Sequence, residues 1–254
     1  MTRSTSKPMT RTPMTLRVAA IATTVFALAI PALAPPAGAV TGGTRPTPNA
    51  AQQCKGASIK PIVHADAVRR TATLANLVAR LGTNKDPYGL NGPQISALQA
   101  ASGGITALDG QIAGTCYPSA DALKADAQKL FVDYRVYWLR GPQTAAIRAA
   151  DALAGARVRL ARAAAKAAPL VGSNAKAQAD LAAMNSALAT ADAKLGTPPN
   201  PAAAIAAAAG LQPAADMTND TAVLESAHAD LLAAKAALAA ARASGLAVLD
   251  DLKG

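Results

Sequence analysis

The sequence has few of the residues on which strand-rich and disulfide-rich proteins depend. Aromatic residues make up 3% of the 254 residues, charged residues 16%, and there are two cysteines. Two cysteines can form only one bridge, which excludes a small disulfide-rich scaffold. No Gly-X-Y period is present, which excludes a collagen-like chain. A strand-rich fold is disfavoured, because strands are enriched in the β-branched and aromatic residues that are scarce here.

Groups that catalysis needs are also scarce. Glu225 is the only glutamate in the chain, and no serine lies in a G-x-S-x-G turn. No glycine-rich loop that could hold a phosphate is present. We therefore expect neither an enzyme nor a bound cofactor.

Alanine is abundant, with 69 of the 254 residues. Because alanine is the strongest helix former, we predict an all-α protein, an elongated antiparallel bundle of about six helices. The last expected helix, 219–252, repeats leucine at 224, 231 and 238 and alanine at 227, 234 and 241. Such Leu/Ala seams, typical of coiled coils, allow helix backbones to approach closely.

Turn and cap residues divide the rest of the chain. Helices are expected over about 58–81, from 93 onward, from the cap Ser119 to about 140, over 142–171 and over 174–195. Gly103-Gly104 predicts a kink or break in the second helix. Gly141-Pro142 predicts that the third helix stops or kinks, which leaves open one kinked rod or a hairpin. The bundle, 56–254, then has possible sub-units 56–140 and 142–254.

The N-terminus has the pattern of a cleaved secretory signal peptide, residues 1–39. Four basic residues precede an apolar stretch from 18 to 34, and Ala37-Gly38-Ala39 predicts cleavage between Ala39 and Val40. Residues 40–55 are polar and rich in proline and glycine, which predicts a disordered leader. The protein is thus expected to be secreted, extracellular or associated with the cell envelope. No later segment is expected to anchor it in a membrane, since the alanine run 202–209 is too short.

Cys54 and Cys116 both follow the predicted cleavage site. An oxidising compartment favours a disulfide between them. The bridge would close a loop of about 60 residues, worth roughly 4 kcal/mol in the chain-entropy model.

Four of the seven aromatic residues fall within eight positions, at Phe131, Tyr134, Tyr137 and Trp138. Phe131, Tyr134 and Trp138 would share one face of a continuous helix. This pattern predicts the aromatic part of the core, with the alternative of a stacking platform for a glycan or other ligand.

Arg135 lies inside the aromatic segment, and Asp151 is on the inner face of the expected fourth helix. The two can meet across the Gly141-Pro142 corner and fix the register of two helices. Tyr134, Arg135, Tyr137, Trp138 and Asp151 are therefore the candidates for a structural cluster or a ligand site.

Basic residues dominate 140–168, where Arg140, Arg148, Arg157, Arg159, Arg162 and Lys166 face only one acid, Asp151. A solvated helix face explains this pattern if the long side chains cover alanine methyl groups. The functional alternative is an anionic-partner patch formed by Arg157, Arg159, Arg162 and Lys166. The whole segment 40–254 has a net charge of +6, which permits an anionic partner without requiring one.

The two histidines each begin a His-Ala-Asp tripeptide, at His64 and His228. Residues at i and i+2 do not share a helical face, so a metal site would need both tripeptides to meet. We expect no metal site, and coincidence in an alanine-rich sequence explains the repeat.

The run Tyr134-Arg135-Val136-Tyr137, followed by Gly141-Pro142 and by Arg148-Ala149-Ala150-Asp151, resembles uncharacterised secreted helical proteins of actinobacteria. The Leu-x-x-Ala-x-x-x-Leu pattern around 224–249 is similar too, so the resemblance covers roughly 120–252. It implies an extracytoplasmic helical bundle and carries no known activity.

These observations favour an exported, non-catalytic helical protein with a structural or interaction role at the cell envelope or outside the cell. Its expected partners are an anionic cell-wall polymer or another helical protein. Nucleic acid is not expected, because no base-stacking or groove-reading motif is present. The alternative is a bundle that binds a small ligand or metal through the Tyr134–Trp138 region or the histidines.

Overall fold

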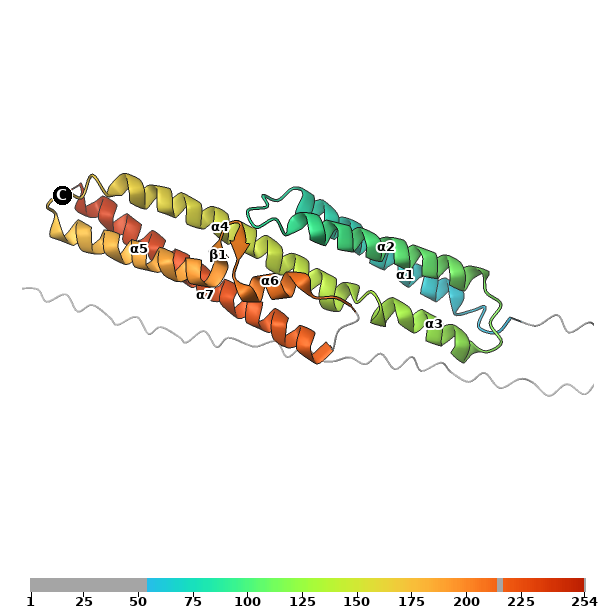
Figure 1. Ribbon diagram of the computed structural model, residues 1–254. Coiled ribbons are helices and arrows are strands. Elements are labelled where there is room, and N and C mark those ends of the chain that lie inside the picture. Colours follow the sequence, from blue (N-terminus) through green and yellow to red (C-terminus); the bar gives the residue numbers. More distant parts are fainter. Residues whose placement is uncertain (1–53, 214–216, 254) are drawn as a thin grey trace, which may run out of the picture. The chain divides into compact units, whose positions relative to one another are not determined.

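A computed structural model describes residues 54–213 and 217–253, and it confirms the all-α prediction (Figure 1). The predicted signal peptide, its predicted cleavage site and the predicted leader up to residue 53 lie outside the described residues. The helices are α1 (Lys60–Gly82), α2 (Asn91–Gly114), α3 (Ala120–Val132), the π-helix η1 (Val136–Arg140), α4 (Gly141–Ala167), α5 (Ala175–Leu195), α6 (Ala203–Gly210) and α7 (Met217–Asp251). Two short strands, β1 (Gly196–Thr197) and β2 (Asn200–Pro201), pair antiparallel after α5.

Side-chain caps begin two helices where the sequence predicts them. The Ser119 hydroxyl accepts a hydrogen bond from the Ala122 backbone N–H at 3.1 Å. Asn174 accepts from the backbone N–H groups of Lys176 and Ala177, each at 3.1 Å. Both caps satisfy donors that the first turn of a helix leaves without an intrahelical partner.

The helices α1 and α2 pack side by side (Figure 1). Together with α3 and η1 they form one cluster of buried apolar residues. Leu74, Leu98, Ile105 and Leu123 are fully buried in it. The predicted disulfide between Cys54 and Cys116 is present and ties the segment before α1 to the loop before α3. Beside it, the Lys55 backbone N–H donates to the Tyr117 carbonyl at 2.9 Å.

The second cluster lies between α4, α5 and α7. The predicted alanine seam of α7 is fully buried at Ala227, Ala234 and Ala241, and Leu231 and Leu238 are buried beside it. Small seam residues let α7 lie close to α5, because side-chain size sets the distance between packed helices.

Residues Asn219–Asp251 of α7 are long and apolar enough to cross a membrane, judged by length and composition only. The sequence-based expectation is that no later segment resembles a membrane span, and α7 differs from it by this measure. In the structure, α7 places its buried seam against α5 and α4. A core helix of a soluble protein also has this composition, so this property is weak evidence for a span.

The connection between α3 and α4 corrects two predictions. The helix breaks at residues 133–135, where Arg135 has a left-handed backbone with φ of 41°, and Gly141-Pro142 does not interrupt η1 and α4. The Gly141 N–H donates to the Val136 carbonyl, and Pro142 lies in the first turn of α4, where a missing N–H costs little. Similarly, α2 runs through Gly103-Gly104 without a break.

Candidate functional site

Three aromatic side chains lie at the surface around the break between α3 and η1. Phe131, Tyr137 and Trp138 are 56%, 50% and 68% exposed. The prediction that they belong to the core is wrong, because the chain leaves its helical path at 133–135 and the i, i+3, i+7 spacing no longer defines one face. Large exposed aromatic side chains in one region mark interaction sites. We call these three residues the aromatic platform.

Arg70 of α1 holds two rings of the platform. Its guanidinium carbon lies 4.2 Å from the ring centre of Phe131 and 5.1 Å from that of Tyr137. Arg70 is only 4% exposed, and its Nε donates to the Asp66 carboxylate at 2.6 Å. Each cation–π contact contributes about 1 kcal/mol or more where the cation is desolvated. The carboxylate thus fixes the guanidinium, and the guanidinium fixes rings from both sides of the chain break.

The π-helix η1 is anchored at both ends. At its start, Arg135 Nη1 donates to the carboxylate of Asp220 in α7 at 2.6 Å. At its end, Arg140 Nη1 donates to Gln143 Oε1 at 3.2 Å. The Gln143 amide nitrogen donates in turn to carbonyls at the C-terminus of α6, including that of Leu211 at 2.9 Å. Arg140 is buried, which lowers its pKa, and the link through Gln143 connects this cation to the negative end of a helix dipole.

The predicted contact between Arg135 and Asp151 is wrong. Arg135 pairs with Asp220, whereas Asp151 accepts a hydrogen bond from the Asn84 amide at 3.1 Å. The left-handed backbone at 135 directs its side chain toward α7 instead of the inner face of α4. Arg135 and Asp151 therefore belong to two separate sites.

Tyr134 is the one member of the predicted aromatic cluster that is partly buried. It packs against the α1–α2 cluster, and its ring lies beside Gly104 of α2. A Cβ atom at Gly104 would lie 2.5 Å from the Tyr134 hydroxyl oxygen, whereas Gly103 has open space around it. Gly104 thus makes room for this ring.

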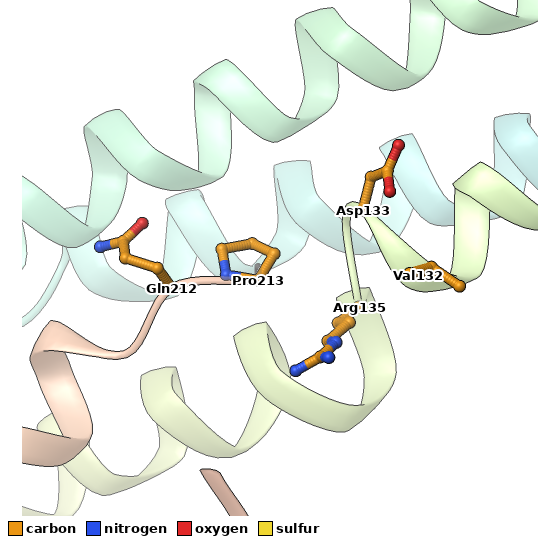
Figure 2. A pocket seen from close by; sticks show the side chains of 5 residues that line it. All are labelled: Val132, Asp133, Arg135, Gln212 and Pro213. Carbon is orange, nitrogen blue, oxygen red and sulfur yellow. The ribbon is translucent and has the colours of Figure 1, made fainter. Parts of the chain in front are cut away.

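Next to the chain break lies a hollow of about 340 Å³, lined by Val132, Asp133, Arg135, Gln212 and Pro213. Figure 2 shows that these side chains come from the end of α3, the break itself and the segment after α6. Arg135 and Asp133 are its only charged lining groups of the described residues, and Arg135 already holds Asp220. Among the described residues that line it, no nucleophile is paired with a base.

Asp151 is a buried carboxyl group at the contact between α4 and the loop after α1. Burial raises its pKa to about 6, and the hydrogen bond from Asn84 only partly offsets this effect. Tyr88 is buried nearby, and burial together with the charge of Asp151 raises its pKa to about 12. Perturbed pKa values occur at catalytic sites and in structural networks alike. Neither group lines the hollow beside the chain break.

The predicted anionic-partner patch divides into two parts. Arg157 donates two hydrogen bonds to the Asp192 carboxylate of α5, at 2.7 and 2.5 Å, so it joins helices. Arg159, Arg162 and Lys166 are exposed, and within the described residues no acid forms an ion pair with them. A stripe of three cations on one face of α4 therefore remains accessible.

The two histidine tripeptides do not meet. His64 is hydrogen-bonded to Asp109 of α2 at 2.7 Å, while Asp230 accepts from Lys194 of α5 at 2.8 Å. In the part of the chain that the structure describes, no group of three or more His, Cys, Asp or Glu side chains could hold a metal.

Three residues that hold the chain break or the aromatic platform were not predicted from the sequence as members of this site: Arg70, Asp66 and Asp220. Arg70 leaves a signal, because it interrupts the otherwise apolar buried face of α1 formed by Val63, Ala67 and Leu74. Asp66 lies one turn before it. Asp220 leaves no local signal, since its partner Arg135 is 85 positions away.

Comparison with family models, with curated proteins and with solved structures finds no match to this chain.

Proposed function

We propose that this protein is a non-catalytic binding protein, exported from the cell, that contacts its partner at the envelope or outside the cell through the aromatic platform. One observation carries the proposal: three aromatic side chains that could fill a core are exposed instead, and a buried arginine holds two of them in place. Exposing these rings to water costs about 25 cal/mol per Å² of apolar surface. A binding role explains why this cost is retained.

The anchors of η1 support the same role. Ion pairs and hydrogen bonds at Arg135 and Arg140 fix the backbone that carries Tyr137 and Trp138. A surface that is already ordered loses little conformational entropy when a partner binds.

The test is retention of the purified protein by cell-envelope material from a Gram-positive bacterium. A variant with Phe131, Tyr137 and Trp138 changed to alanine should lose most retention at unchanged folding. The matched control changes three exposed leucines elsewhere to alanine, at Leu170, Leu232 and Leu249. Thermal unfolding verifies that both variants fold. Equal retention of the wild type and the platform variant would refute the proposal.

A second candidate function is binding of an anionic partner by the cationic stripe of α4. The exposure of Arg159, Arg162 and Lys166 favours it, since within the described residues they have no acidic partner. Binding by charge must weaken as salt rises, because ions screen exposed charges over about 10 Å at 0.1 M. A charge-reversed variant at these three positions should then lose the salt-sensitive part of the retention while the platform variant keeps it.

A further inference from the structure

We infer that the aromatic platform binds the pyranose rings of a polysaccharide. The inference rests on the proposed function and names its ligand. The rings of Phe131, Tyr137 and Trp138 are at least half exposed, so they offer aromatic surface to a ligand. One side of a pyranose ring presents several polarised C–H groups, which aromatic faces attract, while its hydroxyl groups stay at the edge.

A polar rim beside the rings fits those hydroxyl groups. Asp66 lies next to Arg70, with one carboxylate oxygen on the Arg70 Nε and the other 3.7 Å from the guanidinium of Arg69. Arg69 is exposed and can donate hydrogen bonds, and the partly exposed Asp66 can accept them. A sugar hydroxyl group both donates and accepts, so it can satisfy either residue.

The same rim disfavours an aliphatic partner. An acyl chain laid across the platform would remove Asp66 and Arg69 from water without replacing their hydrogen bonds, which is costly. A polysaccharide avoids this cost because its own hydroxyl groups replace the water.

The platform is ordered before a ligand arrives. Arg70 contacts the rings of Phe131 and Tyr137, although these belong to different segments of the chain. The rings of Phe131 and Tyr137 are therefore held in position without a ligand, which suits the repeated rings of a polymer better than a partner that must reshape the surface.

Trp138 makes the test direct, because it is the only tryptophan in the chain. Tryptophan emission, excited selectively over tyrosine, therefore reports on the platform. The titrants are a β-1,4-linked glucose hexamer, a β-1,4-linked N-acetylglucosamine hexamer, and vesicles of phosphatidylcholine with phosphatidylglycerol. We expect a saturable change in emission with at least one hexamer and none with vesicles.

Phe131→Ala and Tyr137→Ala should each weaken binding of that hexamer about tenfold, as loss of about 1.4 kcal/mol implies. Leu170→Ala and Leu249→Ala are the controls and should bind as the wild type does. Calorimetry replaces fluorescence for Trp138→Ala, which should bind at least tenfold more weakly. Thermal unfolding of each variant separates lost binding from lost structure.

The outcomes distinguish this inference from the proposed function. A response to vesicles alone, or hexamer binding that the platform variants leave unchanged, overturns the polysaccharide assignment. If neither hexamer binds but envelope retention still depends on the platform, the assignment fails and the proposed function stands. If retention is also independent of the platform, both fail.

Discussion

Replacing Asp151 by asparagine should stabilise the protein at pH 7 and have little effect at pH 4. Burial raises the pKa of this carboxyl group to about 6, compared with about 3.9 in an unfolded chain. Between these values the folded state holds a proton that the unfolded state has released. The free energy of unfolding therefore falls as pH rises through this window.

The structure sets the size of the effect. A difference of two pKa units corresponds to about 3 kcal/mol, because each unit is worth about 1.36 kcal/mol. The groups around Asp151 include Asn84, which donates to it, and the nearby carboxylate of Asp86, which raises its pKa further. Asparagine keeps the shape without the charge, so it should remove most of this penalty at pH 7.

Denaturant unfolding at pH 4 and at pH 7 measures the effect. The wild type should lose up to about 3 kcal/mol between these values through Asp151, and Asp151→Asn should lose correspondingly less. Asp250→Asn, at an exposed position, is the control and should follow the pH dependence of the wild type. If Asp151→Asn follows it too, the carboxyl group is not the buried acid described above.

Two further predictions concern stability. Gly103→Ala should stabilise the protein by up to about 1 kcal/mol through helix propensity, whereas Gly104→Ala should destabilise it by about 1–2 kcal/mol because the new Cβ displaces the Tyr134 ring. Calorimetric melting of the two variants tests this prediction. If both substitutions change the stability in the same direction, the packing of Tyr134 against Gly104 is contradicted. Changing Cys54 and Cys116 to alanine should cost about 4 kcal/mol in the chain-entropy model, since the bridge closes a separation of 62 residues. Denaturant unfolding checks this value, and an unchanged midpoint would mean that the bridge does not constrain the unfolded chain.

Local signals in the sequence were enough to predict most of the fold. Ser119 and Asn174 cap helices at the expected positions, and the alanine seam of α7 is buried as its spacing requires. The disulfide followed from two observations: the chain has only two cysteines, and both follow the predicted signal peptide. The caps and the seam depend on residues that are close in the sequence, and two cysteines allow only one disulfide within the chain.

The break between α3 and η1 could not be placed from the sequence. Gly141-Pro142 is the conspicuous helix breaker, yet proline is tolerated in a first turn, and the chain continues through it. Arg135, at the actual break, pairs with Asp220, which is distant in sequence. The prediction from the sequence placed the break at Gly141-Pro142, several residues too late in the chain. With a continuous helix up to that point, the aromatic side chains were predicted to lie in the core, and an exposed platform was only the alternative.

The helix α4 contributes to both apolar clusters, with Ile147 in one and Ala150 and Ala154 in the other. These residues are less than two turns apart on an unbroken helix. Unfolding of α4 at one cluster would therefore also disturb its packing in the other. The protein should therefore melt in one cooperative transition, and damage near the platform should lower the hydrogen-exchange protection of α5 and α7.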